Sequence, residues 1–308
     1  MSNSKVDILR SYVEAVASNI DGNSVPDEID LVFGSGAFNG GSAIGAAIFI
    51  KELEKQGKIK VRRISGSSVG SLVALAYITD KFDYVEQMHS EGRKMMRETG
   101  SFEGIHDILS QIVDTVSDDK IGILIENIRD RLFISYNDAS NFSYHVVSTY
   151  STKADLVNAL ERSCYMPLIT DGDVCIDEKY FDGVVPHLFN DSEIPVLVVT
   201  LAQVSQLAKI ASIRGEENPH ARVLSGATDA STFFLTGRSI LCSWRNKWGY
   251  RDYAFHYMSY YCIALTCVVM YYLKTTSLLQ PLRESQISCI ATHVTSLLFR
   301  DMMKICCA

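Results

Sequence analysis

The sequence contains one segment whose residue types and spacing suit nucleophilic catalysis, Gly66-Ser67-Ser68-Val69-Gly70. A catalytic serine needs a sharp turn between a strand and a helix that exposes its hydroxyl, and small flanking residues permit that backbone. The N-terminus of the following helix also favours the negative charge that develops during the reaction. The pattern therefore predicts Ser68 as a nucleophile. The alternative is that Ser68 only caps the helix that follows it.

A glycine-rich loop precedes this motif, with the sequence Gly-Ser-Gly-Ala-Phe-Asn-Gly-Gly over residues 34–41. Between a strand and a helix, the backbone N–H groups of such a loop point toward an anion. A dinucleotide site would need a glycine where Asn39 stands and an acidic residue after the second strand, and both are missing. We expect both loops at the carboxyl ends of adjacent parallel strands, where this one can hold the oxyanion that forms beside Ser68.

A serine nucleophile also needs a base, and the sequence offers two kinds. Histidines that follow Ser68 are one possibility, and the candidates by chain order are His187, His220, His256 and His293. A carboxylate acting directly on the hydroxyl is the other. Asp182 supplies one at a predicted strand end, where Gly183 allows a tight turn. The residues alone leave both possibilities open.

Alternating strands and helices position these motifs. Strands predicted at 30–33 and 58–64 each lead through a loop into a helix, at 42–56 and 71–78. This βαβα order predicts an α/β fold with a mostly parallel sheet. Hydrophobic patterns further predict helices at 6–20 and 153–162, a charged helical region at 81–140, strands at 142–148 and 195–201, and a hairpin arm at 175–181.

Composition limits the class of protein. The chain has 308 residues, 47% of them hydrophobic, and a net charge of −7, which excludes wholesale disorder and disfavours a generic nucleic-acid binder. Residues 201–308 carry 11 Lys and Arg against 6 Asp and Glu. That imbalance indicates either an anionic partner for this half or ordinary variation of surface charge.

The region after residue 240 combines aromatic, cationic and apolar side chains. Residues 253–273 are long and apolar enough for a membrane span, yet their many tyrosines favour a buried or interfacial helix. The preceding segment suits a lipid headgroup layer, or else it packs on the body of the protein; its aromatic and cationic residues are Trp244, Arg245, Lys247, Trp248, Tyr250 and Arg251.

The cysteines and the N-terminus suggest an intracellular, cytoplasmic protein. None of the eight cysteines forms a C-x-x-C pair, so zinc-ligand spacing is absent and reduced thiols are expected. The first residues, including Asp7 and Glu14, lack the apolar core of a signal peptide. Peripheral association with a membrane is compatible with these expectations.

Three ordered segments together resemble the patatin-like phospholipases. They are the glycine-rich loop with its helix (31–54), the elbow (64–70, similar to I-S-G-T-S-A-G), and residues 159–167 followed by Phe181-Asp182-Gly183, similar to A-L-x-x-S, proline, then D-G. The resemblance implies a patatin-like three-layer fold, with a catalytic domain at 28–201 against which the helix at 6–20 packs. Residues 202–308 are expected to form a mainly helical, apolar C-terminal region with possible membrane contact.

The resemblance also implies a function. A dyad of Ser68 and Asp182 would hydrolyse acyl esters of phospholipids or acylglycerols at a membrane surface, without histidine, metal, cofactor or nucleic acid. The matching oxyanion-loop residues are Gly36, Ala37 and Gly40, and the matching motif glycines are Gly66, Gly70 and Gly183. The family loop usually reads D-G-G-G-x-R-G, whereas this chain has Ser35, Ala37 and Asn39. The alternative is a catalytically silent protein of the same fold that binds lipid or a protein partner.

Overall fold

The computed structural model describes residues 3–82, 84–118, 120–141, 143–190, 193–201, 220–275, 300–301 and 303–304. These residues contain a seven-stranded sheet in which β4-β3-β2-β1-β6-β7 is the strand order and β5 pairs with β3. The four inner strands are parallel, while β4, β5 and β7 are antiparallel to their neighbours. The strands are β1 (Glu28–Phe33), β2 (Lys60–Ser67), β3 (Leu132–Asp138), β4 (Ser143–Val147), β5 (Tyr180–Phe181), β6 (Val196–Val199) and β7 (Cys242–Trp244). The predicted α/β fold with a mostly parallel sheet is confirmed.

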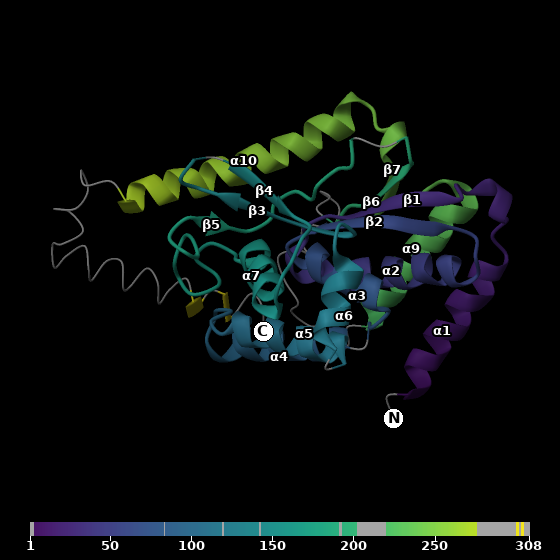
Figure 1. Ribbon diagram of the computed structural model, residues 1–308, viewed down its shortest axis with the longest axis horizontal. Coiled ribbons are helices and arrows are strands. Elements are labelled where there is room, and N and C mark those ends of the chain that lie inside the picture. The colour runs from purple at the N-terminus through teal and green to yellow at the C-terminus, as the bar shows by residue number, and fades with distance from the viewer. Residues whose placement is uncertain are drawn as a thin grey trace.

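Helices cover both faces of this sheet, so the molecule has three layers. In Figure 1, α10 crosses above the sheet. The helices that lie below it are α1 to α7 and α9. The helices are α1 (Asn3–Ser18), α2 (Gly40–Lys55), α3 (Val69–Thr79), α4 (Tyr84–Glu98), α5 (Ile105–Ser117), α6 (Ile121–Ile128), α7 (Lys153–Cys164), α9 (His220–Thr236) and α10 (Tyr250–Thr275).

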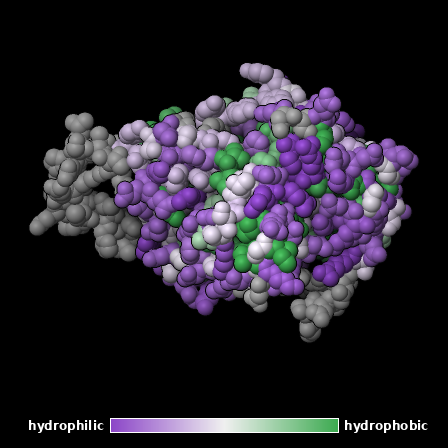
Figure 2. All heavy atoms as spheres, in the orientation of Figure 1, coloured by the Kyte–Doolittle hydropathy of each residue, from purple (hydrophilic) through white to green (hydrophobic). Residues whose placement is uncertain are grey.

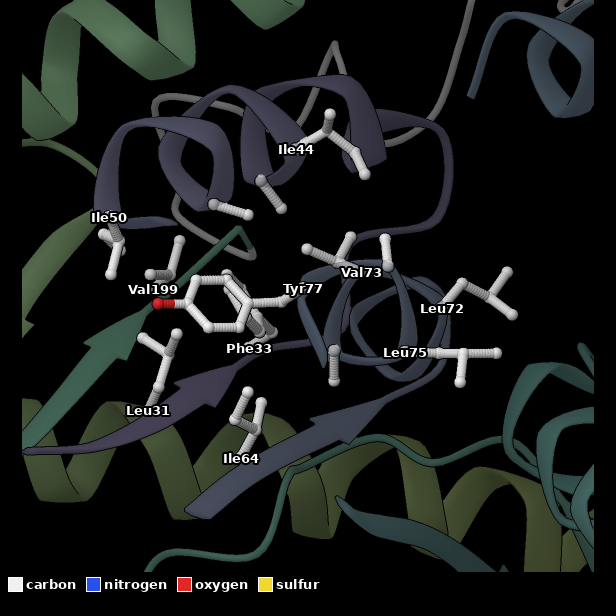
Figure 3. Packing of buried hydrophobic residues seen from close by; sticks show 14 of the residues in the cluster. Leu31, Phe33, Ile44, Ile50, Ile64, Leu72, Val73, Leu75, Tyr77 and Val199 are labelled. Atoms are coloured by element: carbon white, nitrogen blue, oxygen red, sulfur yellow. The ribbon is translucent and has the colours of Figure 1, made fainter. Parts of the chain in front are cut away.

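The core follows from the alternation of side chains along the strands. Leu31 and Phe33 of β1 point toward α2 and α3, where Tyr77 packs against them (Figure 3). Val32 faces the opposite side and joins a second apolar cluster with Phe189. All of these side chains are fully buried, and each such aliphatic residue stabilises the fold by roughly 1.5–3 kcal/mol. Figure 2 shows that the outer surface on the viewed side is mostly hydrophilic, with small hydrophobic patches.

Helix α1 packs on the body of the protein. Val13 and Ala17 on its inner face are buried in the main core. Lys58 closes the end of the helix, because its Nζ donates hydrogen bonds to the carbonyl oxygens of Ala17, Ser18 and Ile20. The chain after α1 therefore returns to the sheet in a fixed direction.

The expectation of a helical region throughout 81–140 is wrong at its end, because β3 lies at Leu132–Asp138. This strand carries the polar residues Ser135, Asn137 and Asp138, which interrupt the apolar pattern of a strand, yet all three are buried. Their side chains have partners inside the fold: Ser135 Oγ donates to the carbonyl of Val185, and Ser140 N–H donates to Asp138. The sheet therefore gains a strand beside β2 that local hydrophobicity does not reveal.

The described C-terminal elements join the same body. β7 extends the sheet beyond β6, and α9 packs along α2. Trp244 ends β7, and Trp248 Nε1 donates a hydrogen bond to Ser243 Oγ at 2.9 Å. Among the described residues, no helix combines the length and apolar character needed to cross a membrane. The domain boundary at residue 201 stays a prediction, and residues 202–219 and 276–299 of the C-terminal region lie outside the described residues.

Candidate active site

Ser68 occupies a strained turn between β2 and α3. Its backbone has φ 51° and ψ −133°, a conformation that costs a non-glycine residue roughly 1–3 kcal/mol. The flanking glycines make room for the turn, because a Cβ on Gly66 would overlap the Gly70 carbonyl and one on Gly70 would overlap the Phe33 carbonyl. Strain held in place by such close packing is typical of functional turns.

Asp182 follows β5 in a second tightly held turn. Its N–H donates to the carbonyl of Tyr165 at 2.9 Å, and its own carbonyl accepts from Asn137 Nδ2 at 2.5 Å. The next residue must be glycine, because a Cβ on Gly183 would overlap the carbonyl of Ser135. The aspartate therefore projects from a backbone that β3 and the end of α7 fix on both sides.

The structure brings Asp182 and Ser68 together. Burial raises the pKa of Asp182 to about 7, and hydrogen bonds from the Ser68 side chain and the Gly183 backbone partly oppose this shift. The residue keeps some exposure, but its Oδ1 is buried without a hydrogen-bond partner within the described part of the chain. Phe181 and Val184 beside it pack against Cys267 and Val268 of α10. An aspartate in this setting can exchange a proton with a hydroxyl near neutral pH.

Ser163 of α7 links the two turns. Its Oγ accepts the N–H of Ser68 at 2.9 Å and donates to the carbonyl of Ser135 at 2.7 Å. Its own carbonyl accepts the N–H of Gly183 at 2.9 Å. This serine belongs to the motif at 159–167, but the sequence does not reveal its role, since its contact with Ser68 spans 95 residues. Its place at the end of α7 follows from the capping box of Thr152 and Asp155, which fixes where that helix begins.

The glycine-rich loop lies at the N-terminus of α3, next to Ser68. Gly40 contacts Val69 so closely that a Cβ there would lie 2.5 Å from Val69 Cγ2. Ala37 has φ 40°, and Asn39 N–H turns back to the carbonyl of Gly36 at 2.8 Å. Within the described residues, the N–H groups of Ala37 and Phe38 donate to no backbone carbonyl. They are the loop donors best suited to an oxyanion, together with the predicted Gly36.

Asn39 stands where the resemblance expects a cation. It is fully buried, and its Oδ1 accepts the hydroxyl of Ser42 at 2.8 Å. Its Nδ2 has no hydrogen-bond partner among the described residues. The side chain is thus packed into the base of the loop.

The histidine alternatives lie in other surroundings. His187 stacks on the ring of Phe133, and the pKa of His256 falls to about 4 because of burial and then the charge of Arg245. No histidine of the described chain is among the groups that shift the pKa of Asp182. His293 lies outside the described residues.

The basic and aromatic segment before α10 is partly structural. Arg245 donates from Nη1 to the carbonyl of Phe189 at 2.8 Å. Lys247, Tyr250 and Arg251 remain exposed. Only these three of the predicted surface residues are therefore available to a lipid headgroup layer.

Comparison with known proteins agrees with this geometry. The family model described as patatin-like phospholipase matches residues 31–187, just over half of the chain. A human protein, patatin-like phospholipase domain-containing protein 4, is 26% identical over 144 residues. That match covers 46% of this chain and 57% of the human protein, so it includes little more than half of the relative.

Proposed function

Because the chain belongs to the patatin-like phospholipase family, we propose that it is a lipid acyl hydrolase that works through a dyad of Ser68 and Asp182. The observation that carries this proposal is the placement of the Ser68 hydroxyl beside Asp182, a carboxyl whose pKa burial raises to about 7, on turns that Ser163 links together. The strained turn at Ser68 adds support, because it holds a hydroxyl at the N-terminus of α3.

In the first half of the reaction, Ser68 Oγ attacks the ester carbonyl carbon while Asp182 accepts the hydroxyl proton. The carbonyl oxygen becomes an oxyanion that the N–H groups of Ala37 and Phe38 can stabilise. The bond from this carbon to the leaving oxygen then breaks. Asp182 returns its proton to that oxygen, so an alcohol leaves and Ser68 carries the acyl group.

In the second half, water replaces the alcohol. Asp182 takes a proton from the water, whose oxygen attacks the acyl carbon and forms a second oxyanion in the same loop. When the bond to Ser68 Oγ breaks, the proton passes from Asp182 to that oxygen. A fatty acid leaves and both side chains return to their starting states.

The surroundings of Asp182 suit an apolar substrate. Beside the carboxylate lies an apolar surface formed by Phe181, Val184 and the inner face of α10. We propose phospholipids or acylglycerols as substrates, in agreement with the family and with the printed name of the human relative.

Trapping with a fluorophosphonate tests the dyad. The reagent should label Ser68 alone, and peptide mapping should find no label in Ser68→Ala. Ser71→Ala is the matched control, because the Oγ of Ser71 lies one turn away and donates to the Ser68 carbonyl. Label at Ser67 or Ser71 in the parent would overturn the assignment of the nucleophile.

A silent, lipid-binding protein is the second possibility, and the loop favours it. Ala37 adopts φ 40°, where the family pattern has glycine, so the oxyanion donors are held under strain. Binding of a fluorescent fatty acid without fluorophosphonate labelling or turnover of a p-nitrophenyl ester would support the silent alternative.

We propose that α10 docks the protein on a membrane surface. Its buried side packs beside Asp182, while its outer side exposes a stripe of large apolar side chains at helical spacing. This stripe includes Met258 at 60%, Tyr261 at 57%, Leu265 at 57% and Tyr272 at 52%. Amphipathic aromatic residues next to exposed cations such as Lys247 and Arg251 suit a headgroup layer.

Vesicle sedimentation tests this docking. The parent should sediment with phosphatidylcholine vesicles that contain phosphatidylserine, and a Met258→Ser, Tyr261→Ser, Leu265→Ser variant should not. The control replaces Leu224, Leu235 and Ile240, which are 49%, 54% and 50% exposed but lie on or just after α9. Equal binding by the two variants would place the docking surface elsewhere.

A further inference from the structure

Helices α2 and α9 meet at reciprocal glycine contacts. A Cβ on Gly45 would overlap the carbonyl of Val223, and a Cβ on Gly226 would overlap the carbonyl of Ser42. The two backbones therefore touch without intervening side chains, which fixes α9 along the first turns of α2. Since α2 begins directly after the glycine-rich loop, this packing also fixes α9 relative to that loop.

Arg222 lies one turn before Gly226 and reaches the loop. Its side chain is buried, with 5% of the residue exposed, and its Nη1 donates to the carbonyl of Phe38 at 2.7 Å. The contact joins residues 184 positions apart in the chain. Hydrogen bonds from a charged donor are about twice as strong as neutral ones, so this bond is well suited to holding backbone in place.

The peptide between Phe38 and Asn39 is consequently held at both ends. Arg222 binds its carbonyl, and its N–H donates to the carbonyl of Gly36. This peptide follows Ala37, whose φ of 40° is disfavoured for alanine. Without a bond at the Phe38 carbonyl, the turn could relax toward a negative φ at Ala37, and the N–H groups of Ala37 and Phe38 would turn with it.

We propose that Arg222 is a positioning residue that keeps the oxyanion loop in its productive conformation. The inference rests on the proposed hydrolytic function, since it assigns the loop to the oxyanion. Arg222 brings a cation from α9 to the carbonyl of Phe38, the residue before Asn39 in the loop. Asn39 is fully buried and bonded to Ser42, so it completes the base of the loop rather than replacing the cation.

Kinetics of Arg222 variants with a p-nitrophenyl ester test this role. Arg222→Met should lower kcat about 30-fold, because the N–H groups of Ala37 and Phe38 lose the orientation that stabilises the oxyanion, with KM changed less than about threefold. Arg222→Lys keeps a charged donor and should lose less. Guanidinium ion should restore part of the activity of Arg222→Ala, which a purely structural defect would not allow.

The matched control is Phe233→Leu, a core substitution farther along α9 at a residue that is 6% exposed. It should lower the stability but leave kcat within about twofold. Hydrogen exchange of peptides covering residues 34–41 should be faster in Arg222→Met than in the parent or the control, because the loop loses its support.

Equal kcat values for Arg222→Met and the control, or unchanged exchange of the loop, would overturn the inference. A parent protein that neither turns over ester nor reacts with fluorophosphonate would overturn the proposed function instead. In that case the exchange comparison still decides whether Arg222 holds the loop.

Discussion

The two turns that carry Ser68 and Asp182 differ from α9 in how the sequence encodes them. At the turns, glycines next to the functional residue prevent backbone overlap, so the chemistry and its structural requirements lie within a few residues of each other. Helix α9 lies beyond the family match and has no motif, yet Gly226 and Arg222 connect it to the oxyanion loop. A short motif can therefore mark a proposed nucleophile while a distant helix packs against the loop beside it.

The largest effect should come from the turn at Asp182. Asp182→Asn should lower kcat by about a thousandfold or more, because it removes the base. The variant should also be more stable than the parent at pH 8. The parent carboxyl ionises near pH 3.8 when unfolded and near 7 when folded, so its stability falls as the pH rises through that window.

Thermal unfolding of both proteins between pH 4 and 8 measures this difference. The stability advantage of Asp182→Asn should be about 2–4 kcal/mol at pH 8 and should shrink toward pH 4. A constant difference across that range would mean that Asp182 is not the group whose pKa folding raises.

The second effect tests the packing of α9. Gly226→Ala should destabilise the protein by about 3 kcal/mol, because the added methyl overlaps the carbonyl of Ser42. Gly122→Ala is the control, since Gly122 lies in α6 with nothing within 4 Å of an added Cβ. That variant should be stabilised by up to about 1 kcal/mol. Urea unfolding compares the two, and similar midpoints would show that α9 does not touch α2 closely.

A smaller effect is expected at the link between the turns. Ser163→Ala leaves the Ser68 N–H without its acceptor and should lower kcat about tenfold. Ser231→Ala is a matched control, because the hydroxyl of this buried serine donates within α9 itself, to the Thr228 carbonyl. If both variants kept the parent kcat in steady-state assays, Ser163 would be a packing residue alone.

The smallest expected effect is the change of the reaction rate with pH. The rate should rise with pH and reach half of its plateau near pH 7, where half of Asp182 is ionised. A pH profile of kcat/KM for the parent measures this midpoint. A midpoint near pH 4 would indicate that the Asp182 carboxylate is solvated rather than buried.

Sequence could predict the elements whose signals are local. The strand before Ser68, the turn and the apolar helix after it follow one another within about 20 residues, and hydrophobic spacing identifies all three. The inner strand β3 escaped prediction because its buried polar residues interrupt the apolar pattern of a strand, so the segment is assigned to the helical region before it. The roles of Ser163 and Arg222 depend on contacts across 95 and 184 residues, and no local pattern encodes such contacts.

The antiparallel strand β7 has a consequence for the limits of the folding unit. It covers the outer side of β6, whose four residues from Val196 to Val199 are all buried and apolar. A chain cut at residue 201 would leave the N–H and C=O groups of that strand unpaired along an apolar edge. Such edges recruit strands from other molecules, so residues 28–201 produced alone should aggregate, whereas a chain that retains β7 keeps this edge covered.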